Sequence, residues 1–167
     1  MTESVTPPFA TCDLCDAHEA DTTFRVLPPV FLDFGAVRPF CGPVHTLRCP
    51  EDNSRVREAV NSPGQGRVLV VDGGGSLRHG LVGGNLAVAA ANNGWAGIVV
   101  DGCVRDVAEL RVCGVPIRAL ALIPLRTAKH NEGQAGVPVR IGGVPVRPGD
   151  WLYADADGIV VANRALI

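Results

Sequence analysis

The chain has 167 residues, with 15 lysines and arginines against 17 aspartates and glutamates, and a formal charge of −2. A chain of this length buries roughly two thirds of its unfolded surface, which favours one domain with a substantial core. The near balance of charge excludes the basic footprint expected of a protein that binds nucleic acid or anionic lipid directly. It favours a small molecule or a protein as the partner.

The first residues are acidic and proline-containing, where a signal peptide has a basic end and an apolar core. The longest apolar runs, near residues 119–125, are far shorter than the roughly 20 residues that cross a bilayer. The sequence therefore predicts a cytoplasmic protein with no membrane partner. Residues 1–10 are expected to form a flexible tail, and residues 11–167 one α/β domain.

Next along the chain, Thr11 is expected to cap a short helix that carries Leu14. Two strand-like segments follow, FRVLPPVFLDFG and PVHTLRC, separated by glycine and proline turn signals. The polar segment at 51–61 predicts a helix, and the Pro-Gly pair at 63–64 stops it.

The middle of the chain predicts a β-loop-α-β unit. Residues 68–71 and 98–100 are continuous apolar runs, typical of strands buried on both faces. An alanine-rich helix is expected between them, over Asn85 to Asn93. We expect the two strands to be parallel, with a right-handed crossover. A short helix over 106–113 and a third apolar run, VPIRALALIPL, follow.

From Val137 the pattern changes to short alternating segments broken by glycine and proline pairs, which predicts a β-meander. The order of elements indicates a layered α/β domain rather than a full nucleotide-binding wind. Six cysteines are spread along the chain, and Cys12 and Cys15 form a C-x-x-C pair that suits half of a zinc site or a redox pair. Because no second pair of that spacing exists, buried reduced thiols are the favoured interpretation.

Two glycine clusters lie in the stretch VVDGGGSLRHGLVGGN. A dinucleotide fingerprint that starts at Gly73 requires glycine at 78, where the chain has Arg78, and the P-loop interval from Gly75 to Gly80 lacks the Lys-Ser/Thr that must follow. Both nucleotide motifs are therefore excluded. An acidic residue and glycines after a strand are also weak evidence for a methyltransferase.

The second cluster immediately precedes the expected helix. Backbone N–H groups there lack intrahelical partners, and the helix dipole favours an anion. Glycines at 83 and 84 would let a carboxylate approach the backbone closely. Turn formation explains a single cluster equally simply, but two clusters in one connection favour a ligand.

Parallel strands end at one edge of a sheet, so the segments after Asp72 and Asp101 are expected to open into one crevice. Arg105 and Asp106 would then face the glycines. The arginine offers a planar fork for carboxylate or enolate oxygens, and the aspartate a hard oxygen for Mg²⁺. From spacing alone, a surface arginine and a helix N-cap aspartate explain the pair equally well.

The segments GRVLVVDGGGSLRHGLVGGNLA, NGWAGIVVDGCVRDVAEL and GDWLYADADGIVV resemble the family that contains the regulator of ribonuclease E activity A and the metal-dependent 4-hydroxy-4-methyl-2-oxoglutarate aldolases. The resemblance runs from about Thr11 to the C-terminus. It implies an α/β sandwich of the swivelling β/β/α type, assembled as a homotrimer or a dimer of trimers. It also implies cleavage of 4-hydroxy-2-oxo dicarboxylic acids to pyruvate and a second oxo acid, and decarboxylation of oxaloacetate, with a divalent cation such as Mg²⁺ or Mn²⁺.

The resemblance assigns substrate binding to four consecutive backbone positions, Gly83, Gly84, Asn85 and Leu86. It implies that Arg105 holds the pyruvate oxygens and that Asp106 ligates the metal, so that both stabilise the enolate. Aldolase members carry an aspartate at the position of Gly84, and this missing carboxylate would orient metal-bound water for proton transfer. Members that regulate ribonuclease E also depart from the motif in its carboxylates. A non-catalytic inhibitor of ribonuclease E is therefore the second candidate, and the retained Asp106 favours the enzyme.

A Schiff-base aldolase is disfavoured, because the single lysine, Lys129, lies in a polar loop where nothing predicts the apolar burial that lowers a lysine pKa. His79 is expected to be a loop side chain rather than a base. Trp95, Trp151 and Tyr153 are expected in the core or between subunits.

Overall fold

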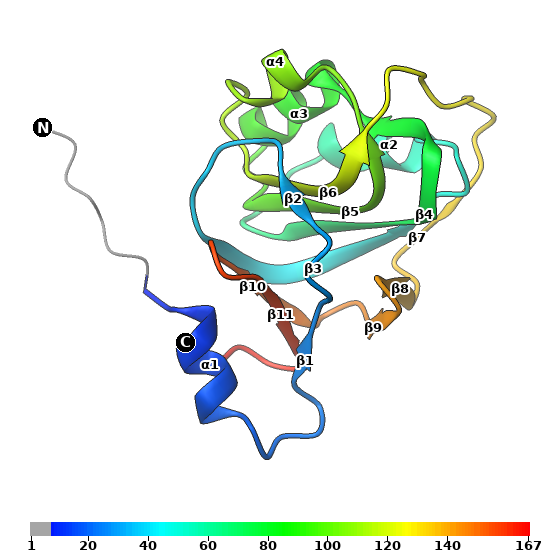
Figure 1. Ribbon diagram of the computed structural model, residues 1–167. Helices are drawn as coiled ribbons and strands as arrows, with labels where there is room; N and C mark the ends of the chain where they lie inside the picture. The colour runs from blue at the N-terminus through cyan, green and yellow to red at the C-terminus, as the bar shows by residue number, and fades with distance from the viewer. Residues whose placement is uncertain (1–7) are drawn as a thin grey trace, which may run out of the picture.

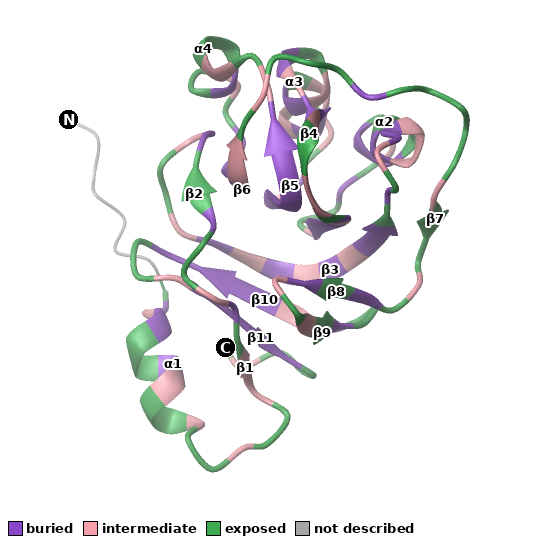
Figure 2. Ribbon diagram, turned by 45° about the vertical axis from the view of Figure 1, so that its right-hand side comes forward, coloured by how far each residue is buried: buried purple, intermediate pink, exposed green. Residues whose placement is uncertain are grey.

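The computed structural model describes residues 8–167, and its centre is a block of four parallel strands (Figure 1). These strands are β3 (Phe40–Arg48), β4 (Val68–Val82), β5 (Gly97–Val104) and β6 (Ile117–Leu122). Every residue of β5 is buried, as expected of a parallel strand that is covered on both faces (Figure 2). The predicted parallel pairing of the two apolar runs, now β4 and β5, is confirmed.

Antiparallel strands extend this block into a sheet with the order β1-β11-β10-β3-β4-β5-β6-β2, while β7 pairs with β3 off this path. The added strands are β1 (Arg25–Val26), β2 (Leu32–Asp33), β7 (Gln134–Ala135), β10 (Trp151–Ala154) and β11 (Ile159–Ala162). A separate hairpin is formed by β8 (Val139–Ile141) and β9 (Val144–Val146). The C-terminal strands therefore form two hairpins, and only β10–β11, which is almost wholly buried, joins the main sheet.

Three helices cover one face of the parallel strands (Figures 1 and 2). They are α2 (Ser54–Val60), α3 (Gly84–Asn92) and α4 (Val107–Leu110). Apolar side chains of these helices, including Val56, Ala87 and Leu110, pack on the strand residues Val71 and Val100 in one core. The opposite sheet face forms a second core with both C-terminal hairpins. Helices, sheet and hairpins thus make a layered α/β fold, as predicted.

The remaining helix, α1 (Thr11–Ala17), lies beside β1 and β11, away from the other three (Figure 1). Thr11 does not cap it, because Ala10 is the N-cap residue and makes no side-chain bond. Instead the backbone N–H and the hydroxyl of Thr11 donate to the carboxylate of Asp155 at 2.7 and 2.6 Å. The sequence expectation missed this contact because the two residues are 144 positions apart.

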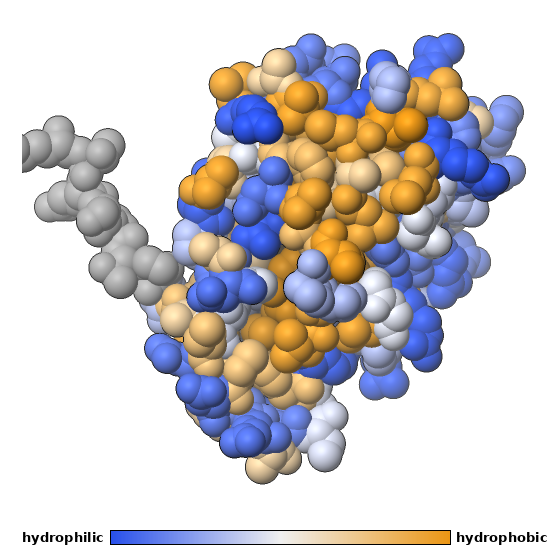
Figure 3. Space-filling view, viewed as in Figure 1, coloured by the Kyte–Doolittle hydropathy of each residue, from blue (hydrophilic) through white to orange (hydrophobic). Residues whose placement is uncertain are grey.

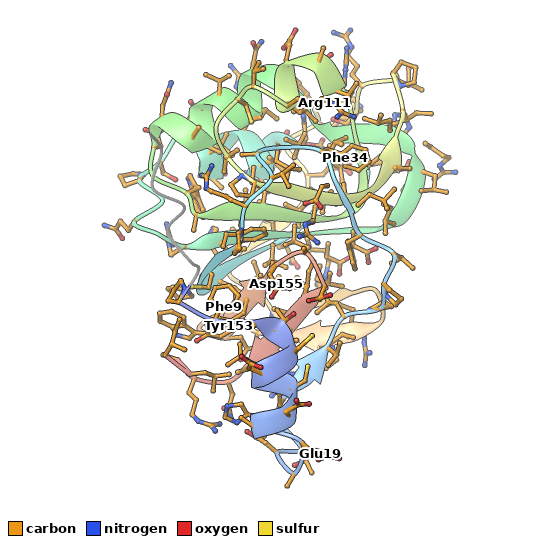
Figure 4. All side chains as sticks on the ribbon, turned by 60° about the vertical axis from the view of Figure 1, so that its left-hand side comes forward. Phe9, Glu19, Phe34, Arg111, Tyr153 and Asp155 are labelled. Carbon is orange, nitrogen blue, oxygen red and sulfur yellow. The ribbon has the colours of Figure 1, made fainter. Side chains whose placement is uncertain are left out.

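The expected N-terminal tail lies largely outside the described residues, which begin at residue 8. Within it, Phe9 is buried and packs edge-on against Tyr153, with ring centroids 5.3 Å apart (Figure 4). Tyr153 and Trp95 are buried, as expected of core residues, and Trp151 stacks beside Tyr153.

Three expected elements are shorter than the sequence indicates, and one of them is α4, which covers only Val107–Leu110 of the helix expected over 106–113. The segment FRVLPPVFLDFG contains only the two-residue strands β1 and β2, because its central proline pair cannot donate to a sheet. The helix expected at 51–61 begins at Ser54, since Glu51 has a left-handed backbone with φ of 55°.

The first glycine cluster, Gly73–Gly75, does not form the expected loop. Strand β4 runs through it, and its register with β5 shifts between Asp72 and Ser76 and again on both sides of Gly80. The second and third glycines have φ of 67° and 71°, a conformation that other residues adopt at a cost. The cluster therefore creates bulges that bend the strand.

All six cysteines are free thiols, but they are not uniformly buried. Cys49 and Cys103 are buried as expected, whereas Cys12 is exposed. Burial, with the nearby carboxylates of Asp52 and Asp72, raises the pKa of Cys49 to about 12, so this thiol is inert. Within residues 8–167, no helix is long and apolar enough to span a membrane.

Candidate functional site

A cleft of about 470 Å³ lies beside the ends of β4 and β5, next to helices α2, α3 and α4. This volume is in the range of small-molecule sites, roughly 300–1,000 Å³. The cleft brings together all the residues that the sequence singled out, Gly83, Gly84, Asn85, Leu86, Arg105 and Asp106. It also contains residues that were not predicted to belong to the site, Asn53, Arg57, Asn61, Gly80, Ala89, Arg126 and Lys129.

The second glycine cluster, Gly83–Gly84, presents the N-terminus of α3 to this cleft. Gly83 is the extended N-cap residue, and the first intrahelical bond runs from the N–H of Ala87 to its carbonyl at 3.0 Å. The N–H groups of Asn85 and Leu86 therefore precede the intrahelical ladder and are available to an anion.

Asp106 links α4 to α3 through its side chain. Its backbone is left-handed, with φ of 62° and ψ of 48°, which is uncommon outside glycine. It stands at the N-cap position of α4 but makes no capping bond there. Its Oδ2 accepts the N–H of Gly84 at 3.0 Å instead. Spacing alone is compatible with Asp106 as a metal ligand or as the N-cap of a helix. Its side-chain bond to Gly84, with no capping bond in α4, does not support the N-cap.

The Arg105 side chain lies against β4 with a free donor. Its backbone N–H is fixed to the carbonyl of Val82 at 2.9 Å. Its Nε is 3.7 Å from Oδ1 of Asp106, too far for a hydrogen bond, and no acceptor among residues 8–167 satisfies this buried N–H. A side chain at Gly80 would press on Arg105, since a Cβ there would lie 3.0 Å from its Cγ. Glycine at 80 thus makes room for the guanidinium.

Glu109 occupies the space of the carboxylate that Gly84 lacks. A Cβ on Gly84 would lie 1.7 Å from Oε2 of Glu109 and 2.9 Å from its Cβ. Gly84 does not have a positive φ, so the backbone conformation does not require glycine there. Glu109 is not among the site residues predicted from the sequence. Its three-residue spacing from Asp106, which puts both side chains on one side of a helical turn, is the signal that could have found it.

The segments that follow Asp72 and Asp101 open into one cleft, as expected, whereas Asp72 and Asp101 themselves do not line it. They are neighbours in register on β4 and β5 and hold the β8–β9 hairpin. Asp72 accepts the N–H of Arg140 at 3.1 Å, and Asp101 accepts that of Gly142 at 3.1 Å. Burial, and secondarily the charge of Asp72, raises the pKa of Asp101 above its usual value, although the bond from Gly142 opposes the shift.

The side chains at the cleft fit a hydrated divalent cation rather than an all-protein metal cage. Within the described chain, no three His, Cys, Asp or Glu side chains are arranged to hold a metal. Mg²⁺ needs only one or two carboxylates when water completes its shell. The half-open carboxylate of Asp106, with Oδ1 free of backbone bonds, meets that requirement.

His79 lies elsewhere than expected, whereas Lys129 lies in an exposed loop, as expected. His79 belongs to β4 rather than to a loop, and its Nδ1 is 2.9 Å from the carbonyl oxygen of Arg126. Lys129 is an exposed residue that lines the cleft. No local signal places either side chain, because their positions depend on pairing between β4 and residues 125–130.

This fold and site define an α/β protein with a cleft at the edge of a parallel sheet, lined by Arg105, Asp106 and the N-terminus of α3. The chain belongs to the RraA-like family, described as Aldolase/RraA, whose model matches residues 11–161. A relative from Albidiferax ferrireducens, provisionally named a 4-hydroxy-4-methyl-2-oxoglutarate aldolase, is 62% identical over 98% of this chain and 100% of its own. One from Cupriavidus necator with the same name is 58% identical over 93% and 96%. The solved RNA-processing inhibitor RraA from Thermus thermophilis is 45% identical, covers 95% of both chains and superposes with a TM-score of 0.90.

Proposed function

We propose that the protein is a divalent-metal-dependent lyase that acts on oxo-dicarboxylic acids through a pyruvate enolate, as a 4-hydroxy-4-methyl-2-oxoglutarate aldolase, an oxaloacetate decarboxylase or both. The observation that carries this proposal is the junction of Arg105, Asp106 and the α3 N-terminus, tied together by the bond from Gly84 to Asp106. The names of the two most similar relatives described above support the aldolase class.

Each group at this junction suits one part of the substrate. The free N–H groups of Asn85 and Leu86 would bind the carboxylate of the pyruvate unit. The unpaired Nε–H of Arg105 would stabilise the oxygen that becomes negative in the enolate. A bound Mg²⁺ or Mn²⁺, held by Asp106, would add Lewis-acid polarisation of the 2-oxo group. Glu109, whose carboxylate lies against Gly84, would exchange a proton with the reacting atoms or with water.

The test is turnover of oxaloacetate and of 4-hydroxy-4-methyl-2-oxoglutarate, each with and without Mg²⁺ or Mn²⁺. Turnover that disappears with a chelator and returns with either cation is expected. Activity that persists in the presence of the chelator would contradict metal dependence. Absence of both reactions would contradict the proposed lyase function.

Binding to ribonuclease E is the second candidate function. Solved relatives include the RNA-processing inhibitor from Thermus thermophilis and, at 32% identity with a TM-score of 0.75, an RNase ES inhibitor family member from Streptomyces coelicolor. Tight binding to a ribonuclease E fragment without turnover of either oxo acid would favour this function over the lyase.

We also propose assembly as a homotrimer or a dimer of trimers. Apolar side chains gather on the face that contains β2 and β6 (Figure 3), where Leu32, Leu122 and Leu125 are 56%, 45% and 57% exposed. Such a patch is typical of a subunit interface. Sedimentation at micromolar concentration should give a species of three or six chains, and a 17.5 kDa monomer would contradict the proposal.

A further inference from the structure

The cleft has more positive charge than a pyruvate unit requires. Beyond Arg105 it is lined by three further cations, Arg57, Arg126 and Lys129. None of these three forms a salt bridge with a carboxylate of residues 8–167. Unpaired cations that converge on one small cleft favour a ligand with a second negative group.

The segment that carries Arg126 and Lys129 is held in place on both sides. The N–H of Gly80 donates to the carbonyl of Leu125 at 2.7 Å, and the ring of His79 bonds to the carbonyl of Arg126. After Lys129, the N–H of His130 donates to the carboxylate of the buried Asp52. These bonds fix the backbone from which the two cationic side chains extend, so little backbone ordering is needed when a ligand binds.

Gly80 also relates these cations to the proposed pyruvate site. It forms a backbone bridge with Arg126, and its Cα faces the aliphatic part of the Arg105 side chain. Arg126 and Arg105 therefore flank the same glycine. A ligand held at one end by Arg105 extends from it toward the other cations of the cleft.

Asn53 supplies an independent sign that a ligand reaches this end of the cleft. Its side chain lines the cleft although the residue is only 8% exposed. Its Nδ2 donates to the carbonyl of Leu81 at 3.2 Å, which fixes the amide orientation. Its buried Oδ1 has no donor among the described residues. Since an unpaired buried acceptor is unfavourable, a ligand hydroxyl would fit here.

We propose that Arg126 and Lys129, assisted by Arg57, form a second anion subsite that binds the distal carboxylate of a five-carbon 2-oxo dicarboxylate. This inference rests on the proposed function, which puts the pyruvate unit at Arg105 and the α3 N-terminus. Carbon 4 of such a substrate then lies toward the three cations. In a 4-hydroxy substrate that carbon bears both a carboxylate and a hydroxyl, which match the cations and the free oxygen of Asn53.

The test compares two ligands of equal length by titration calorimetry in Mg²⁺ buffer. 2-Oxoglutarate has the distal carboxylate, and 2-oxopentanoate has a methyl group in its place. The wild-type protein should bind 2-oxoglutarate at least tenfold more tightly. Arg126→Ala and Lys129→Ala should each weaken 2-oxoglutarate roughly tenfold, since a charge-assisted hydrogen bond is lost, and should change 2-oxopentanoate less than twofold.

Arg111→Ala is the matched control, because it removes one positive charge from the exposed end of α4, outside the cleft (Figure 4). It should change neither affinity. A wild type without preference for 2-oxoglutarate, or cleft variants that weaken both ligands equally, would overturn the subsite. An acidic peptide is titrated in parallel. Cleft variants that lose affinity for the peptide but keep their affinity for 2-oxoglutarate would assign the cations to a protein partner and also overturn the subsite.

The binding test separates the subsite from the lyase function. If the wild type turns over neither oxo acid but prefers 2-oxoglutarate and loses that preference in Lys129→Ala, the subsite stands and the lyase fails. If turnover is normal but the preference is absent, the lyase stands and the subsite fails.

Discussion

The two glycine clusters lie eight residues apart in one stretch of chain, yet they serve opposite structural purposes. In Gly73–Gly75, two glycines have positive φ, and a side chain on Gly74 would meet nothing within 4 Å. In Gly83–Gly84, neither glycine has positive φ, but a Cβ would lie 2.7 Å from Asp106 Oδ2 or 1.7 Å from Glu109 Oε2.

The first cluster therefore provides conformational freedom and the second provides space. The glycines of the first cluster bend strand β4, and none of them lines the cleft. Space at the second cluster lets the carboxylates of Asp106 and Glu109 lie against the start of α3, and Asp106 lines the cleft. The count of glycines does not distinguish these cases, whereas the neighbours of each Cα do.

The largest effect is expected at the second cluster, from Asp106→Asn. Asparagine keeps an acceptor for the Gly84 N–H and tolerates the left-handed backbone, but it removes the charge that would hold the cation. Turnover should fall by about 10²- to 10³-fold, with the melting temperature nearly unchanged. Steady-state rates across a Mn²⁺ titration measure this loss. Wild-type rates at ordinary metal concentration would remove Asp106 from the site.

Moving the carboxylate from position 109 to position 84 tests whether the two positions are interchangeable. Glu109→Ala should reduce aldol cleavage by about 10²-fold, the lower end of the contribution of a positioned acid or base, and should spare oxaloacetate decarboxylation. Gly84→Asp alone should weaken both reactions, because the new side chain collides with Glu109. The double variant Gly84→Asp/Glu109→Ala should regain part of the cleavage rate. A double variant no better than Glu109→Ala would show that the two carboxylates are not interchangeable.

At the first cluster, Gly74→Ala should affect stability and leave catalysis intact. An alanine with φ near the observed 67° costs about 1–2 kcal/mol. For a chain of this size the melting temperature should fall by roughly 2–8 °C. Calorimetry measures the change, and kcat/KM should stay within twofold. A tenfold loss of kcat/KM would mean that the bend of β4 positions the site.

The smallest effect is expected from Asp101→Asn, beside the first cluster. The raised pKa means that folded Asp101 binds its proton more tightly than the unfolded chain does, so the ionised carboxyl lowers stability above the folded pKa. That penalty disappears as the pH falls through the folded pKa toward the unfolded value of 3.8. Asparagine keeps an acceptor for Gly142, so the variant should be more stable by less than about 1 kcal/mol at pH 7 and gain nothing near pH 4. Urea unfolding at both pH values checks this, and a variant less stable at pH 7 would contradict it.

The parts of the fold and site that the sequence predicted depend on local pattern and parallel topology. Apolar runs gave the β4–β5 pairing, and the shared end of those strands brought Arg105 and Asp106 to Gly84. Glu109 was within reach of the same reasoning, since it is one helical turn beyond Asp106.

The parts that the sequence could not predict depend on distant contacts. The sequence predicts Lys129 in a polar loop, and pairing of that loop with Gly80 and Asp52 brings the residue to the cleft. Likewise, Thr11 was assigned to a helix cap because its partner Asp155 is near the other end of the chain. No periodicity or spacing encodes such contacts.

The central claim is that the second cluster, with Arg105 and Asp106, stabilises a pyruvate enolate with a divalent cation. Proton NMR of pyruvate in D₂O tests it directly, because enolate formation exchanges the methyl protons for deuterium. The wild-type protein with Mg²⁺ should remove the methyl signal far faster than buffer with Mg²⁺ alone, and Arg105→Ala or removal of Mg²⁺ should abolish the acceleration. A methyl signal that decays at the buffer rate in the presence of wild-type protein and Mg²⁺ would contradict the claim.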